Sequence, residues 1–332
     1  MKKVVWGVLS TAQIGTQKVI PAMLASDHIE VRAIASRTPE TAREAAAALG
    51  IALAYGSYAE LLADPLIEAI YNPLPNHLHV PLTLQAARAG KHVLCEKPIA
   101  LNAAEAAALR EVADRVLVME AFMVRFHPQW LRARELIRDG QIGMPRAVQM
   151  MFSFFNEDPA NIRNDARMGG GALCDIGCYA VTAGRFFFET DPVRGVALLD
   201  RDPRFGTDRL ASALLDFGAG RHLDFTVSTQ CVSYQRLQIL GSKGRIEIQV
   251  PVNAPAGTEV RLFIDDGSAF NGAAARTETF AAVDQYRLQA EVFSRAIRGE
   301  VELPYGIEHA INGMRALDAL FRSEKSGRWE DV

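Results

Sequence analysis

The sequence predicts an α/β protein of two domains, a doubly wound parallel sheet followed by an α+β domain with a large, mostly antiparallel sheet. The chain has 332 residues, roughly twice the length of a typical single domain. Short apolar strands alternate with helical segments up to about residue 121, which is typical of the βαβ units of a parallel sheet. From residue 195 onward, strands follow one another without helices between them. We therefore predict an N-terminal domain over residues 1–121 and a C-terminal domain over residues 122–332.

The elements of the first domain are predicted from apolar runs and from helix-start signals. Thr38-Pro39-Glu40 combines an N-cap, a proline at the first helical position and an early acid, and Asn102 can cap a later helix. The expected strands are Val4–Leu9, Val31–Ala35, Ile67–Asn72, His92–Cys95 and Val116–Met119, and the expected helices are Ile14–Leu24, Pro39–Leu49, Tyr58–Leu62, Val80–Ala89 and Ala103–Ala113. Strands and helices in this alternation predict a parallel sheet that is covered on both faces.

The second domain is predicted to pack its helices on one face of its sheet. Glycine-rich turns, such as Gly218-Ala219-Gly220, separate the late strands as hairpins require. The expected helices are His127–Asp139, one after Gly169-Gly170-Gly171, Gln285–Arg298 and Ile307–Lys325, and the expected strands are Ala147–Phe155, Gly195–Leu199, Ser212–Asp216, His222–Ser228, Tyr234–Leu240, Arg245–Gln249 and Val260–Ile264. The remaining face either is solvated or packs against a second copy, and we expect a dimer or tetramer formed through this sheet.

Composition and charge exclude several classes of protein. Hydrophobic residues make up 49% of the chain and charged residues 23%, so disorder is excluded. A net charge of −3 gives no attraction to nucleic acid or to anionic membranes. No apolar run reaches the roughly 20 residues that a membrane-spanning helix needs. The apolar start is a first strand rather than a signal peptide, because it is short and ends in a polar turn.

The cysteines indicate a reduced protein without a metal site. The chain contains four cysteines, too few for a disulfide framework at this length, which fits a cytoplasmic location. Cys174 and Cys178 lack a second pair of ligands at metal-binding spacing, so we interpret them as packing residues and expect no metal.

The turn after the first strand is the place where a dinucleotide phosphate would bind. In the segment Gly7–Gly15, small residues join a strand to a helix, although Ser10 and Ala12 stand where the glycines of the usual fingerprint would be. An ordinary strand-to-helix turn is the alternative. The end of the second strand carries Ser36 and Arg37 instead of the carboxylate that accepts from the ribose of NAD. Both side chains can donate to a 2′-phosphate, which favours NADP over NAD, the alternative being a solvated arginine.

Two further segments carry groups suited to acid–base chemistry. Lys97 follows the fourth strand, at the end of a parallel strand where ligands bind, although it can equally be a surface charge paired with Glu96. Asp175 and Tyr179 are four residues apart and therefore share one helix face. The three glycines before this helix would leave its first amides open to a ligand. A phenol close to an ammonium becomes a usable acid or base, whereas Tyr179 in a core would be purely structural.

These segments together resemble the glucose-fructose oxidoreductase/inositol dehydrogenase (Gfo/Idh/MocA) family, and more closely its branch of NADP-dependent D-xylose and dihydrodiol dehydrogenases. The resemblance is carried by Trp6–Ala12, Ala35–Arg37, Tyr71–Asn76, Glu96–Pro98, Glu120–Pro128, Gly169–Tyr179 and Asp284–Arg287. It implies an N-terminal Rossmann domain, and a cis peptide bond before Pro98. Many members of the family have a histidine where this chain has Tyr179, and the Tyr-bearing branch includes the sugar and diol dehydrogenases.

The resemblance also implies the residues of the site. Lys97, Asp175 and Tyr179 would form the catalytic group, with Asn161 and Arg163 as substrate contacts. The cofactor would be lined by Ser10, Thr11, Ala12, Gln13, Ile14, Ser36, Arg37, Pro73, Leu74, Asn76, His79, Glu96, Lys97 and Arg125. The expected reaction is a hydride transfer between NADP and a hydroxyl-bearing carbon of a sugar or cyclic diol. Two alternatives within the family are a nucleotide-sensing regulator without turnover and a glycosidase that uses bound NAD.

Overall fold

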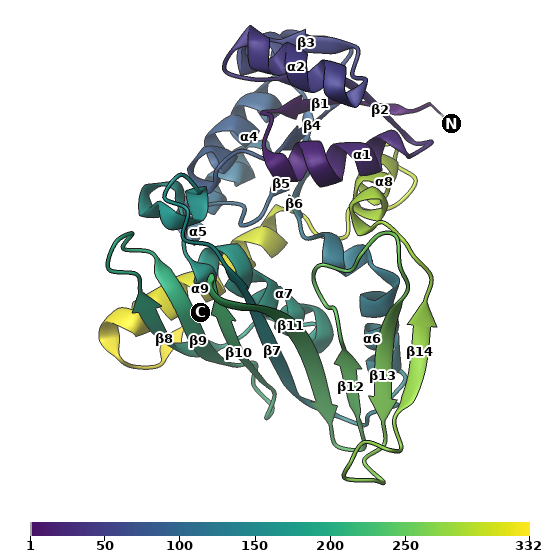
Figure 1. The fold of residues 1–332 in the computed structure, drawn as a ribbon, viewed down its shortest axis with the longest axis vertical. Coiled ribbons are helices and arrows are strands. Elements are labelled where there is room, and N and C mark those ends of the chain that lie inside the picture. The colour runs from purple at the N-terminus through teal and green to yellow at the C-terminus, as the bar shows by residue number, and fades with distance from the viewer. Residues whose placement is uncertain (1) are drawn as a thin grey trace. The chain divides into compact units, whose positions relative to one another are not determined.

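The computed structural model describes residues 2–332 and divides into two compact units (Figure 1). The first unit contains the residues up to Met123 together with Tyr286–Met314, and the second contains Val124–Gln285 together with Arg315–Val332. The division assigns part of the C-terminal helical region to the first unit, whereas the sequence placed everything after residue 121 in one domain.

The first unit is built on a six-stranded parallel sheet. Its strands are β1 (Val4–Leu9), β2 (Ile29–Ala35), β3 (Leu53–Tyr55), β4 (Ala69–Asn72), β5 (His92–Glu96) and β6 (Val118–Ala121). Their order in the sheet is β3-β2-β1-β4-β5-β6, and every neighbouring pair is parallel. The order reverses between β1 and β4, which creates the switch point beside which ligands of such sheets bind. The doubly wound prediction is confirmed.

Three helices of this unit begin at a capping side chain, which belongs to Thr38, Ser57 or Asn102. The helices of the unit are α1 (Ile20–Leu24), α2 (Pro39–Leu49), α3 (Tyr58–Ala63), α4 (His79–Arg88) and α5 (Ala103–Ala107), followed near the other end of the chain by α8 (Gln285–Ile297) and the first part of α9 (Ile307–Ser326). The side chain of Asn102 accepts from the amide of Glu105 at 2.9 Å, as predicted. The ring of Trp6 lies 5.7 Å from that of Phe293, and its Nε1 donates to Ser294, which ties α8 to β1.

The second unit contains a nine-stranded sheet. Its strands are β7 (Pro145–Phe155), β8 (Arg194–Arg201), β9 (Asp208–Asp216), β10 (His222–Ser228), β11 (Gln230–Gly241), β12 (Arg245–Ile248), β13 (Val260–Asp265), β14 (Arg276–Phe280) and β15 (Glu330–Asp331). Their order is β14-β13-β12-β11-β7-β10-β9-β8-β15. Only β7 and β10 pair in parallel among the described strands of this sheet, so the mostly antiparallel prediction is confirmed.

Helices cover one face of this second sheet, as Figure 1 shows for α6 (Pro128–Arg138) and α7 (Cys178–Phe188). The side chains of Leu223, Phe225 and Val227 alternate along β10 and are buried beneath α7. Apolar side chains on the opposite face stay exposed, for example Met151 at 48% and Tyr234 at 43%. A sheet with one buried and one open face explains the alternation of apolar and polar residues in its strands.

Candidate active site

The turn after β1 places a serine in a conformation that favours glycine. Ser10 has a φ of 73°, in the left-handed region where a Cβ is strained. Its amide donates to Ala35 at 2.8 Å, and its Oγ accepts from the amide of Ala12 at 3.2 Å. The local side-chain hydrogen bond compensates for the missing glycine. A π-helical segment, Gly15–Val19, follows and runs into α1.

The end of β2 carries the second group of predicted cofactor residues. Ser36 is buried and Arg37 is exposed, and the amide of Ser36 donates to Tyr55 at 3.2 Å. Tyr58 was missed by the sequence reasoning. Its pKa is raised by burial and lowered by the nearby charge of Arg37, so its phenol lies within electrostatic reach of that guanidinium. No sequence signal links residues 37 and 58, because only the pairing of β2 with β3 brings them together.

The turn that carries Lys97 is held by polar side chains from three other elements. The bond between Lys97 and Pro98 is cis, as the resemblance implied. Tyr71 of β4 donates its phenol to Glu96 at 2.8 Å, and Glu120 of β6 accepts from the amide of Ile99 at 2.8 Å. The Nδ1 of His79, in α4, lies 2.7 Å from the carbonyl oxygen of Pro98. The backbone on both sides of Lys97 therefore has a defined path.

His79 joins this turn to another predicted cofactor loop. Its side chain is 1% exposed, and its Nε2 lies 2.6 Å from the carbonyl oxygen of Leu74, in the loop after β4 that also contains Pro73 and Asn76. Burial lowers its pKa to about 4, which favours the neutral ring. A neutral ring has a single N–H, so it donates to one of the two carbonyl oxygens and packs against the other.

Most of the predicted cofactor residues follow the carboxyl ends of adjacent parallel strands. The residues from Ser10 to Ile14 follow β1, Ser36 and Arg37 follow β2, and Pro73, Leu74 and Asn76 follow β4, while Glu96 ends β5 and Lys97 comes directly after it. The carboxyl ends of parallel strands meet at one edge of the sheet, so these loops gather beside the switch point. Arg125 differs, because it belongs to the second unit, where its side chain is 1% exposed.

The second unit brings together the predicted substrate residues. Asp175 lies in a π-helical segment, Leu173–Gly177, which continues into α7 and Tyr179. The Oδ2 of Asp175 accepts from the Nε of Arg163 at 2.7 Å, and Asn161 accepts from the amide of Arg163 at 3.1 Å. The ring of Phe152 packs edge-on against Tyr179, with centroids 6.2 Å apart. A phenol, a carboxylate and a guanidinium are therefore positioned on one helix and on the loop before it.

The glycine stretch before this helix corrects one expectation. The sequence predicted that these amides are open to a ligand, but they donate hydrogen bonds to other groups of the same chain. Gly170 donates to Asp165 and Gly171 donates to Arg163, while the amide of Leu173 donates to Asp208 at 2.6 Å. A Cβ on Gly170 would overlap the carbonyl of Arg163. The glycines thus allow close backbone packing of the substrate loop, and Asp208 is a second residue that the sequence reasoning missed.

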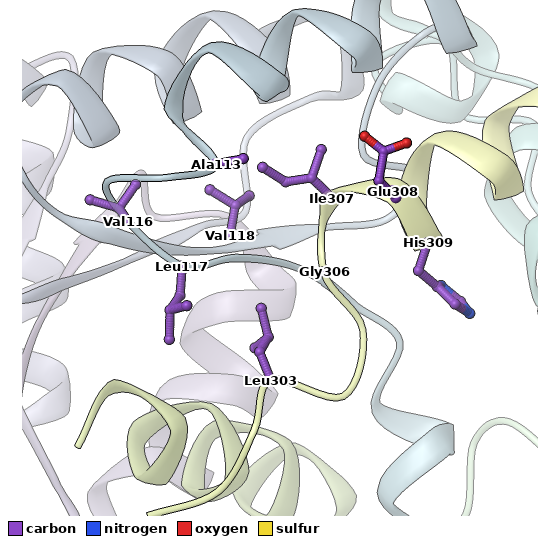
Figure 2. Close-up of a pocket in the computed structure, with 9 residues that line it drawn as sticks. All are labelled: Ala113, Val116, Leu117, Val118, Leu303, Gly306, Ile307, Glu308 and His309. Atoms are coloured by element: carbon purple, nitrogen blue, oxygen red, sulfur yellow. The ribbon is translucent and has the colours of Figure 1, made fainter. Parts of the chain in front are cut away.

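A cavity of about 250 Å³ in the first unit lies at a different place (Figure 2). Val118, the first residue of β6, lines it together with Val116, Leu303 and Ile307. Glu308 at this cavity pairs with Arg110 through two hydrogen bonds. The amino end of β6 is opposite to the edge where the cofactor loops gather, so this apolar cavity contains none of the predicted site residues.

Residues 2–332 contain neither a group of metal-ligating side chains nor a helix suited to span a membrane. Within this part of the chain, no three histidine, cysteine or acidic side chains are grouped to hold a metal ion. None of the helices described there is long and apolar enough to cross a bilayer.

Comparison with known proteins identifies the family. Residues 4–125 match the model of the oxidoreductase family with an NAD-binding Rossmann fold (GFO_IDH_MocA), and residues 130–247 match the GFO/IDH/MocA C-terminal domain. The chain therefore belongs to the GFO/IDH/MocA family of oxidoreductases, as the sequence motifs predicted.

Three relatives illustrate the similarity. An uncharacterized oxidoreductase of Rhizobium meliloti is 47% identical over 100% of both chains. A D-xylose 1-dehydrogenase (NADP(+)) of Haloferax volcanii is 39% identical over 97% of this chain and 98% of that protein. The crystal structure of KijD10, a 3-ketoreductase from Actinomadura kijaniata in complex with NADP and TDP-benzene, superposes with a TM-score of 0.90 at 29% identity, covering 97% of this chain and 98% of that one.

The strained turn at Ser10 yields a first prediction. The substitution Ser10→Gly removes a Cβ from the left-handed region but also the hydrogen bond to Ala12, and relief of roughly 1 kcal/mol of strain offsets that loss. We expect the thermal unfolding midpoint of Ser10→Gly to lie at or above that of the wild type. Ser10→Ala keeps the strain and loses the hydrogen bond, so its midpoint should fall. Equal midpoints for the two variants would contradict this account of the turn.

Proposed function

We propose that the protein is an NADP-dependent oxidoreductase that moves a hydride between the nicotinamide and a hydroxyl-bearing carbon of a sugar or cyclic diol. The observation that carries the proposal is the set of Arg163, Asp175 and Tyr179 on one helix and its preceding loop, in a chain whose other unit presents Lys97 beside a dinucleotide-binding edge. The names of the Haloferax and Actinomadura relatives, which include a sugar substrate, a ketone reduction and NADP, support it.

The residues at the ends of β1 and β2 fit a phosphorylated dinucleotide. The turn at Ser10 leads directly into a helix, whose first amides and positive dipole end favour phosphate. Ser36 and Arg37 would donate to the 2′-phosphate, and they stand where a carboxylate at the end of β2 would repel it. The bound cofactor supplies the nicotinamide ring that accepts or returns the hydride.

The chain itself would supply the proton transfer and the orientation of the substrate. Tyr179 accepts the proton of the substrate hydroxyl during oxidation, and the ammonium of Lys97 holds the same hydroxyl. Asp175 orients the substrate, with Arg163 fixing the rotamer of its carboxylate through the 2.7 Å hydrogen bond. The immediate proton acceptor is either Tyr179 or Lys97, and the two assignments predict different pH profiles for the single variants.

Substrates can be ranked directly by the rate at which NADPH forms. We propose aldoses such as D-xylose as the first class to test, followed by cyclic diols, inositols and anhydro-sugars. A keto-sugar tested in the reverse direction covers the chemistry named for KijD10.

Removal of the proton-transfer groups should abolish most of the turnover. We expect Tyr179→Phe and Lys97→Met each to lower kcat about 100-fold or more, which is the usual size of a general acid–base contribution. The matched control is Tyr305→Phe, since Tyr305 belongs to the first unit, beside the start of α9, where its ring packs against His309. NADPH formation on the best substrate is the measurement. Turnover near that of the wild type in both variants would disprove the assignment.

The choice between cofactors should depend on Arg37. Loss of a charge-assisted contact to phosphate costs roughly 1.5–3 kcal/mol, so Arg37→Ala should lower kcat/KM for NADP about 10- to 100-fold. The value for NAD should change far less, because NAD has no 2′-phosphate. The control is Arg43→Ala, whose guanidinium pairs with Glu40 on the exposed side of α2. An equal decrease with both cofactors would show that Arg37 does not read the 2′-phosphate.

We also propose that the open sheet face pairs with a second copy of the chain. Met151, Val232 and Tyr234 are exposed there and line a cavity of about 510 Å³ with a mostly apolar surface. Light scattering should give a mass of at least twice the 36.3 kDa of one chain. Val232→Glu should lower that mass, whereas Leu66→Glu, which changes an exposed leucine of the first unit, should leave it unchanged. A monomeric wild type would refute the proposal.

A further inference from the structure

Asp208 is a buried carboxylate that lies far along the chain from the helix it contacts. It begins β9, and its side chain is 2% exposed. Its Oδ2 accepts a hydrogen bond from the amide of Leu173 at 2.6 Å. Leu173 is the first residue of the π-helical segment that contains Asp175, and this segment continues without a break into Tyr179. The carboxylate thus holds the backbone at the start of the helix that carries both groups.

The second oxygen of Asp208 lies against the glycine turn. Gly171 has a φ of 117°, and a Cβ at this position would overlap the Oδ1 of Asp208. On the other side of the turn, the amide of Gly171 donates to the carbonyl of Arg163 at 2.9 Å. Position 171 therefore requires a glycine, both because of its positive φ and because of its close contact with Asp208. The same turn joins Asp208 to the backbone of Arg163, which is the partner of Asp175.

We propose that Asp208 is a positioning residue, which fixes the Gly171–Leu173 turn and thereby the placement of Arg163, Asp175 and Tyr179. The inference rests on the proposed function, because that function assigns the chemistry to these three side chains. Asp208 itself would touch neither substrate nor cofactor. Its contribution is to maintain the geometry on which the orientation of a reacting hydroxyl depends.

Burial makes the ionisation of Asp208 unfavourable, and the hydrogen bonds and charges around it offset that cost only in part. Arg201 of β8 faces it, but the guanidinium of Arg201 already forms two hydrogen bonds with Glu324 of α9, and Glu324 itself repels the carboxylate. The amides of Leu173 and of Asp208 itself are the remaining favourable partners. Burial dominates and raises the pKa of Asp208 to about 6.

The direction of this pKa shift shows whether the ionised carboxylate adds to the stability of the fold or acts in another way. A carboxyl whose pKa is higher in the folded state than its ordinary value of 3.8 stabilises the fold less as the pH rises from about 4 to about 6. Above that range the ionised side chain is a net cost to stability, although it binds the amide of Leu173 more strongly than a neutral acid does. A carboxylate at this position therefore strengthens the hold on the helix start and does not add to stability at neutral pH.

The variant Asp208→Asn tests this inference because it keeps the shape and removes the charge. We expect kcat to fall about tenfold at pH 8, and the acidic limb of the kcat profile near pH 6 to flatten. The unfolding midpoint at pH 8 should stay at or above that of the wild type. The matched control is Asp202→Asn, which changes a buried carboxylate of the preceding loop that caps the amides of Arg204 and Phe205 instead. It should lower the midpoint and leave the acidic limb in place.

A measurement without substrate separates this inference from the proposed function. In the wild-type protein labelled with ¹⁵N-leucine, the amide signal of Leu173 should titrate with a midpoint near pH 6, and in Asp208→Asn it should not. A titrating signal combined with no turnover on any sugar or diol would reject the proposed function but would confirm the contact between Asp208 and the amide of Leu173. A wild-type signal that does not titrate, or an Asp208→Asn enzyme with unchanged kcat and an unchanged pH profile, would overturn the positioning role. The wild-type titration decides the question even if Asp208→Asn fails to fold.

Discussion

The candidate site depends on one constraint, that a backbone turn inside a protein must have its amides and carbonyls hydrogen-bonded. Two irregular turns carry the proposed catalytic residues, and buried polar side chains hydrogen-bond to both turns. The turn at Lys97 receives contacts from Glu120 and from His79, each of which bonds a main-chain atom. The turn before Asp175 receives its contact from Asp208. Because these partners come from other elements, each turn is rigid only when its whole unit is folded.

An irregular helix follows each of two site loops, the turn at Ser10 and the glycine turn at Gly169–Gly171. The π-helical segments Gly15–Val19 and Leu173–Gly177 each begin a longer helix directly after a site loop. Such segments cost stability relative to a regular α-helix and are frequent at functional sites. At the second of them, Asp175 lies in the wider turn and Tyr179 in the regular helix that follows. Their relative direction thus depends on where the π-helical segment ends.

Much of the fold follows from local patterns. The strands Val4–Leu9 and His222–Ser228 and the helix Pro39–Leu49 have the predicted bounds. An apolar run, an alternation and a strong cap mark them, respectively. The three-residue strand β3 was not predicted, since a segment so short carries no period of its own. The expected helix Ala103–Ala113 ends as a 3₁₀ segment from Ala108, a difference in hydrogen bonding that propensity does not encode.

The sequence by itself determined the alternation of the longer strands and helices, the family, and the residue types at the strand ends, because these depend on near neighbours in the chain. Lys97 at the end of β5 and Arg37 at the end of β2 belong to this class. Only the tertiary structure decided that Arg163 pairs with Asp175, that Tyr58 lies near Arg37, and that Asp208 holds Leu173. Contacts between residues distant in the chain depend on strand pairing and helix packing, so the local spacing of residues in the sequence does not predict them.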